Sequence, residues 1–86
     1  MTKETKKAFT ARNKDYNSGF TIKFANNYTI SVQFGDANYS DSGHNTAEVG
    51  VWNEKGDWYK LTEGDVVAGW QTPEEVLAIM NKISAL

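Results

Sequence analysis

The sequence of 86 residues contains no cysteine, one proline and one histidine. Without cysteine there is no disulfide framework, no thiolate nucleophile and no cysteine-based zinc or iron–sulfur site. The usual hydrolytic and transfer reactions need a nucleophile with a base, two carboxylates in one cleft, or a metal with three ligands. The histidine, His44, stands in a loop rich in Gly, Ser and Asn and has no obvious orienting partner. We therefore expect no catalytic residues and no enzyme, with His44 as a base or metal ligand the weaker alternative.

Motifs for phosphate and metal binding are also missing. Neither G-x-x-x-x-G-K nor G-x-G-x-x-G occurs. The spacing Asp36-x-Asn38-x-Ser40 matches the first three ligand positions of an EF-hand loop. However, Asp41 occupies the position of the required glycine and Ala47 that of the bidentate glutamate. The sequence therefore predicts no metal site and no cofactor.

Long apolar runs and a signal-peptide pattern are absent as well. We expect a soluble protein that is not exported. The net charge is −2, but residues 1–14 are basic, with Lys3, Lys6, Lys7, Arg12 and Lys14 against Glu4. We expect residues 1–18 to form a flexible basic arm and residues 19–86 to form one domain. The acidic remainder argues against broad nucleic-acid binding.

Two segments alternate apolar and polar residues, as two-faced β-hairpins do. Apolar residues take the even positions of residues 20–34, FTIKFANNYTISVQF, and mostly the odd positions of residues 47–61, AEVGVWNEKGDWYKL. Cross-strand partners share a face, so both hairpins require loops of three residues. These loops are residues 25–27, with Asn27 left-handed, and residues 54–56, where Gly56 supplies that conformation. The second register pairs Trp52 with Trp58 on the face opposite the valines.

The C-terminal part of the sequence predicts a short strand and a helix. DVVAGW, residues 65–70, is a candidate fifth strand, and we expect Trp70 to seal the end of the core. Thr72-Pro73-Glu74-Glu75 provides an N-cap hydroxyl, a proline at the first helical position and a capping box. One apolar stripe on the helix should face the sheet: Val76, Ile79, Met80 and Ile83, widened by Leu77.

Together these elements predict an α+β fold. It has two layers, an antiparallel sheet of four to five strands built from two hairpins and one C-terminal helix that packs on it. The helix covers one face of the sheet only. The other face is polar except for the two tryptophans, and residues 8–18 either add a strand or cover that face.

Two surface features are candidates for binding. Exposed indoles serve as anchors of recognition surfaces and as stacking platforms, although Trp52 and Trp58 can also simply stabilise their hairpin. The loop GDANYSDSGHN, residues 35–45, is about twice the usual length, and its residues form local turns without any ligand. Tyr39, between Asn38 and Ser40, nevertheless resembles the composition of binding loops. The candidate binding residues are Asn38, Tyr39, Ser40, Asp41, His44, Trp52 and Trp58.

Three blocks of the sequence, FANNYTISVQFGDANYS, AEVGVWNEKGDWYKL and VVAGWQTPEEV, occur in this order within residues 19–84. In them the chain resembles a group of small uncharacterised proteins encoded by tailed bacteriophages. The chain departs from the group at Asn27, where glycine is usual, and near Ser40, where cysteine is common. The resemblance implies a phage origin and a location in the host cytoplasm, without implying an activity.

These observations predict a non-enzymatic phage protein that inhibits or sequesters a host component, for counter-defence or host takeover. A host protein or defence complex is the leading partner, because an acidic surface can imitate a nucleic acid. The alternatives are a small-nucleotide sponge that stacks its ligand on Trp or Tyr beside Lys23, Lys60 or the arm, a single-stranded nucleic-acid binder, and a virion or assembly component. No membrane partner is expected. We expect a homo-oligomer, because the domain is small and nothing in the sequence blunts the sheet edges.

Overall fold

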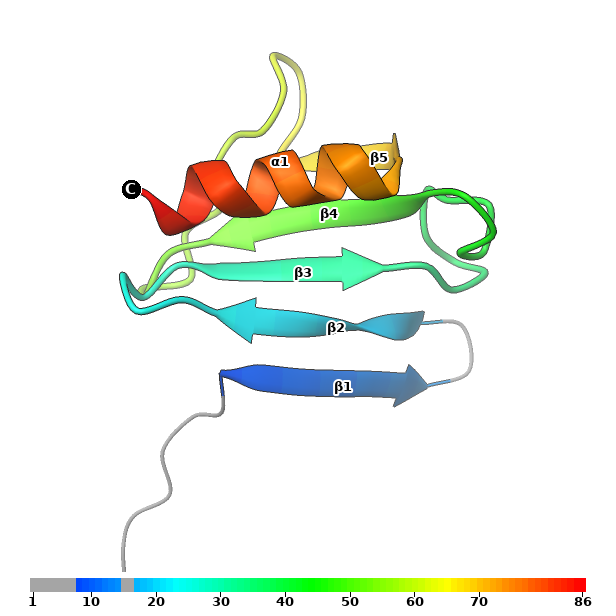
Figure 1. Cartoon of the computed structure of the whole chain (residues 1–86), viewed down its shortest axis with the longest axis horizontal. Helices are drawn as coiled ribbons and strands as arrows, with labels where there is room; N and C mark the ends of the chain where they lie inside the picture. The colour runs from blue at the N-terminus through cyan, green and yellow to red at the C-terminus, as the bar shows by residue number, and fades with distance from the viewer. Residues whose placement is uncertain (1–7, 15–16) are drawn as a thin grey trace, which may run out of the picture.

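The computed structural model describes residues 8–14 and 17–86. Within these residues, five strands form one antiparallel sheet in the order β1-β2-β3-β4-β5, and one helix follows (Figure 1). The elements are β1 Phe9–Lys14, β2 Asn17–Lys23, β3 Thr29–Gln33, β4 Ala47–Trp52, β5 Val67–Gln71 and α1 Pro73–Ser84. The α+β fold expected from the sequence is confirmed.

The first predicted hairpin is present in the predicted register. Phe20 pairs with Val32 and Ile22 with Ile30, so the even positions share one face. Asn27 has a φ of 72° and takes the left-handed place in the three-residue loop. Asn26, beside it, donates from Nδ2 to the carbonyl of Ile83 at 2.8 Å, which ties this loop to the end of α1.

The second predicted hairpin is only partly present. Trp52 pairs with Trp58, and Gly56 has the expected positive φ of 88°. The predicted return strand through Leu61 is wrong, because the chain leaves β4 after Tyr59. β5 occupies that edge of β4 instead, through pairs such as Gly50 with Val67, so the return segment has no free edge to follow.

The core lies between α1 and one face of β3 and β4. Ile30, Val32, Val49 and Val51 are fully or almost fully buried there, and α1 adds Ile83, which is also fully buried. Val76, Ile79 and Met80 pack against this cluster as the helical stripe predicts. Leu77 does not widen the stripe, because its side chain is 58% exposed.

The helix begins as the sequence predicts. Thr72 Oγ1 accepts from the backbone N–H of Glu75 at 3.2 Å, and Glu75 Oε1 accepts from the N–H of Thr72 at 2.8 Å. This is the expected capping box, with Pro73 in the first turn. No helix in the described part of the chain is long and apolar enough to cross a membrane.

Part of the predicted N-terminal arm belongs to the sheet. Phe9 to Lys14 forms β1, which pairs antiparallel with β2 (Figure 1). Of the two alternatives for residues 8–18, an added strand is therefore the one observed. Residues 1–7 and 15–16 of the predicted arm lie outside the described residues.

Trp70 does not seal the core, contrary to expectation. A bulge in β5 lies between the pairs Ala47 with Gln71 and Val49 with Ala68. Trp70 sits in this bulge with a φ of 54°, and its side chain is 58% exposed. A bulge inserts an extra residue and redirects side chains, which explains why the indole leaves the core.

The long loop packs against the same bulge. The N–H of Trp70 donates to the carbonyl of Tyr39 at 2.8 Å. A Cβ on Gly69 would stand 2.6 Å from the Cβ of Tyr39, so only glycine permits this close approach. The loop of residues 35–45 is therefore held beside β5, near one end of the sheet.

Candidate functional site

The face of the sheet opposite α1 consists of three rows of residues that run across the strands. We name them from the strand register. The polar row is Arg12, Gly19, Gln33 and Glu48. The floor row is Thr10, Thr21, Ser31, Gly50 and Val67. The aromatic row is Lys23, Thr29, Trp52 and Trp58.

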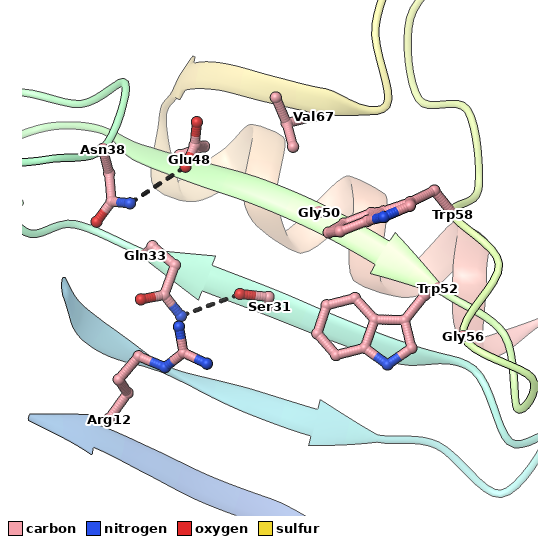
Figure 2. A pocket seen from close by; sticks show the side chains of 10 residues that line it. All are labelled: Arg12, Ser31, Gln33, Asn38, Glu48, Gly50, Trp52, Gly56, Trp58 and Val67. Carbon is pink, nitrogen blue, oxygen red and sulfur yellow. Dashed lines mark hydrogen bonds between the residues drawn. The ribbon is translucent and has the colours of Figure 1, made fainter.

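The small side chains of the floor row leave a depression between the two taller rows. This open-face hollow has a volume of about 480 Å³ (Figure 2). Gly50 and Ser31 lie in it between the tryptophans on one side and Gln33 on the other. Small-molecule sites usually have volumes of this order and combine apolar walls with a few polar groups.

Trp52 and Trp58 form the aromatic side of the hollow. Their ring centroids are 5.3 Å apart, and the ring planes make an angle of 72°. A Cβ on Gly50 would stand 2.8 Å from Trp58 Cζ3, so the indole rests where a side chain at position 50 would be. Trp58 is 53% exposed, and β1 pairs with β2 instead of covering the tryptophans. The indoles therefore offer an apolar surface to a ligand.

Gln33 forms the polar side, and its amide is only half satisfied. Nε2 donates to Ser31 Oγ at 3.0 Å, whereas Oε1 is buried and has no hydrogen-bond partner among the described residues. The side chain as a whole is 6% exposed. Leaving a buried acceptor unpaired costs about 1–3 kcal/mol, and native structures contain few such groups. The Gln33 amide is therefore suited to accept a hydrogen bond from a donor that the described residues do not supply.

Two charged side chains flank Gln33 in the polar row. Gly19 has no side chain between Arg12 and Gln33, and the guanidinium of Arg12 points toward the Gln33 amide (Figure 2). Glu48 lies on the other side of Gln33, on β4. The hollow thus has a cation at its β1 end and an anion at its β4 end.

The long loop contributes Asn38 to the hollow. Asn38 Nδ2 donates to Glu48 Oε1 at 3.3 Å, and Asn38 Oδ1 accepts from the N–H of Gly35 at 2.9 Å. Of the candidate binding residues, Asn38, Trp52 and Trp58 line the hollow together. Tyr39 has a 60% exposed side chain, and its backbone carbonyl is engaged by Trp70.

Asp41 and Ser40 hold the loop together. Asp41 Oδ1 accepts from the backbone N–H groups of Asn45 and Thr46, at 3.0 and 2.9 Å, and from Thr46 Oγ1 at 3.0 Å. The hydrogen bond from the Asn45 backbone is the largest cause that lowers the pKa of Asp41 from 3.8 to about 2. Ser40 is buried and accepts from the N–H of Ser42. The structure therefore gives both side chains a role in loop conformation.

His44 lies apart from the tryptophans. It lines a second hollow, of about 410 Å³, between the loop, β2, β3 and the start of α1, together with Phe20, Phe34 and Met80. This hollow is on the side of the sheet that α1 covers. The predicted site residues therefore divide between the two sides of the sheet.

Seven residues that line the open-face hollow are not among the site residues predicted from the sequence: Arg12, Ser31, Gln33, Glu48, Gly50, Gly56 and Val67. Alternation along β3 and β4 already placed Ser31, Gln33 and Glu48 on the same face as the tryptophans. Their position on the same face as Trp52 and Trp58 was the sequence signal that could have identified them as site residues. The positions of Arg12 and Val67 depend on how β1 and β5 join the sheet, which the local pattern did not determine.

The groups in the hollow are suited to binding. They include one carboxylate, one guanidinium, two amides, a hydroxyl and two indoles. Across residues 8–14 and 17–86, no three His, Cys, Asp or Glu side chains come together as metal ligands would. No protein-family model, curated protein or solved structure gives a significant match to this chain.

Proposed function

We propose that this chain is a non-enzymatic, phage-encoded binding protein that sequesters or inhibits a host component in the host cytoplasm, and that the open-face hollow is its binding site. One observation carries this proposal. Gln33 lines the hollow together with the two indoles, and its buried Oε1 has no hydrogen-bond donor among the described residues. A bound partner that supplies the donor removes the cost of the unpaired acceptor.

The groups in the hollow support binding over catalysis. Glu48 is the one carboxylate among the lining residues, so paired-carboxylate chemistry has no second member there. Ser31 Oγ accepts from Gln33, and the histidine that would act as its base lies on the other side of the sheet. The phage origin and the host component rest on the sequence resemblance.

The test is affinity capture from bacterial host lysate with the full chain and a variant that blocks the hollow. Ser31→Phe places a large ring in the floor row, where Ser31 is partly exposed. Ser84→Phe makes the same change at an exposed position at the end of α1, away from the hollow, and is the matched control. We expect the wild type and Ser84→Phe to retain the same component and Ser31→Phe to lose it. Urea unfolding of all three proteins verifies that they are folded.

Equal retention by Ser31→Phe and Ser84→Phe would contradict the assignment of the hollow. Nuclease treatment and a salt series identify the alternative of single-stranded nucleic-acid binding, because contacts to phosphates weaken steeply with salt. Recovery of the chain in purified particles would instead favour a virion component.

Self-association stays a prediction. Among the described residues, β1 has a sheet neighbour on one side only, and we expect its other edge to pair with a second copy. The bulge and the loop beside β5 leave that strand less suited to pairing. Light scattering coupled to size exclusion measures the oligomeric state directly.

A further inference from the structure

We infer that the occupant of the open-face hollow is a nucleotide with a guanine base, stacked against the indoles, its donor edge toward Gln33 and its phosphate toward Arg12. The inference rests on the proposed function, because it names the ligand of the same site. Three features of the hollow carry it: the length of its floor, the acceptors on its polar side and the placement of its charges.

The distance between the floor row and the polar row matches the width of one nucleobase. Residues on a strand rise about 3.3 Å each, so the floor row lies about 7 Å from the polar row. The Trp58 indole lies over Gly50, so the free part of the floor is the part over Ser31. In the proposed pose, a single flat ring above Ser31 stacks with one face on an indole and points its edge toward Gln33. Stacking of a base on an aromatic side chain contributes about 1–3 kcal/mol.

The polar side offers acceptors on two neighbouring strands. Gln33 Oε1 is unpaired, and Glu48 is its direct neighbour across β3 and β4. Neighbouring strands lie about 4.8 Å apart. Guanine has a ring N–H and an amino group side by side, so it can donate to both residues. Adenine and cytosine have one amino group on this edge, and uracil has a single ring N–H between two carbonyls.

The charges orient the ligand. Arg12 is exposed on the edge strand β1, at the end of the hollow opposite Glu48. A guanidinium binds phosphate through paired N–H donors. Gln33 Oε1 is buried, so binding of a base includes a side-chain movement that exposes this oxygen. Arg12 is exposed, so we place the phosphate of the ligand against its guanidinium.

The experiment is titration of the full chain with guanosine monophosphate, followed by calorimetry and by tryptophan fluorescence. Adenosine monophosphate, uridine monophosphate and guanosine are the comparison ligands. We expect guanosine monophosphate to bind about tenfold or more tightly than uridine monophosphate, which corresponds to one hydrogen bond. An oligothymidine with one central guanine distinguishes a free nucleotide from a base in a strand. Tighter binding of that strand than of the nucleotide would overturn the assignment of a free nucleotide.

Variants separate the three contacts. Gln33→Leu should lose about tenfold in affinity while its stability is unchanged or higher, because the variant removes an unpaired acceptor. Arg12→Gln should abolish the preference for the monophosphate over guanosine. Trp58→Leu should weaken binding at least fivefold, whereas Trp70→Leu, which removes an exposed indole outside the hollow, should leave affinity unchanged.

Absence of binding by all three nucleotides would overturn the nucleotide assignment. If Ser31→Phe still loses the component captured from lysate, the proposed function stands with another occupant. If the nucleotides fail and Ser31→Phe also captures normally, both the ligand and the site are wrong. Equal affinity of Gln33→Leu and wild type would overturn the role of Gln33.

Discussion

The two faces of β3 and β4 are made by alternate residues of the same strands, yet they differ in burial, polarity and packing. On one face Ile30, Val32, Val49 and Val51 are at most 4% exposed and lie under α1. On the other face the same strands carry a serine, a glycine and the half-satisfied Gln33 around an open hollow.

The difference indicates which face stabilises the fold and which face is available for recognition. The covered face follows the rules for stability, with close-packed apolar side chains. The open face keeps two features that reduce stability: Gly50 inside a strand, which costs about 0.5–1 kcal/mol, and an unpaired buried acceptor, which costs about 1–3 kcal/mol. Such local violations are expected at functional sites. Substitutions on the two faces should therefore separate stability from binding.

The largest effect is expected on the covered face. Ile83→Ala removes a fully buried side chain and should lower the free energy of unfolding by about 2–5 kcal/mol, measured by urea denaturation. Leu77→Ala, on the exposed side of the same helix, should cost much less and is the control. Equal losses for the two variants would contradict the packing of α1. The component captured from lysate should still bind to the folded fraction of Ile83→Ala.

A smaller effect is expected where the open face is most crowded. Gly50→Val places a side chain where the Trp58 indole lies, so the indole must move, at a cost of about 1–3 kcal/mol. We expect the circular dichroism signal of the coupled indoles to disappear. Ser31→Val adds a branched side chain to the same row and should leave that signal intact. A persisting signal in Gly50→Val would refute the placement of Trp58 over Gly50.

The capping box should contribute less again. Thr72→Ala removes the acceptor for the Glu75 N–H and should cost about 1 kcal/mol in the free energy of unfolding. Thr62→Ala, at an exposed position outside the helix, removes a hydroxyl that donates to the carbonyl of Asp65 and is the matched control for loss of a threonine side-chain hydrogen bond. Because neither face of the sheet changes, both variants should capture the same component as wild type. Loss of capture in Thr72→Ala would show that the start of α1 affects binding at the open face and would contradict their separation.

The smallest effect concerns the loop that bounds both hollows. The pKa of Asp41 is lowered from 3.8 to about 2, so its ionised form stabilises the folded state above pH 3.8. That contribution is lost as the pH falls toward 2. Asp41→Asn should therefore be less stable than wild type at neutral pH, and the difference should shrink between about pH 4 and pH 2. Thermal unfolding across this range measures it, and a difference independent of pH would contradict the role of the carboxylate.

Local patterns predicted most of the fold. Alternation placed Ile30 and Val49 on the covered face and Trp52 and Trp58 on the other, and the capping box located the start of α1. The local pattern does not decide whether β1 forms, because its alternation is weak and the strand is stabilised by pairing with β2. The prediction that Trp70 seals the core is wrong, because a bulge changes the face on which a side chain lies and has no clear sequence signal.

The candidate site was less predictable than the fold. Asn38, Trp52 and Trp58 were identified from residue type and position, and all three line the hollow. The unpaired oxygen of Gln33 was not predictable, because it depends on what lies around that amide on three strands. His44 is close to Asn38 and Tyr39 in sequence, but the fold places it on the other side of the sheet from the tryptophans.

The most direct test of the central claim is native mass spectrometry of the chain isolated from bacterial cells, wild type beside Gln33→Leu, with the unfolding free energy of each. We expect the wild type to retain a component that is lost from Gln33→Leu, and we expect the stability of this variant to be equal or higher. Retention of the same component by Gln33→Leu, with reduced stability, would show that Gln33 serves the fold and would contradict the assignment of the open-face hollow as the binding site.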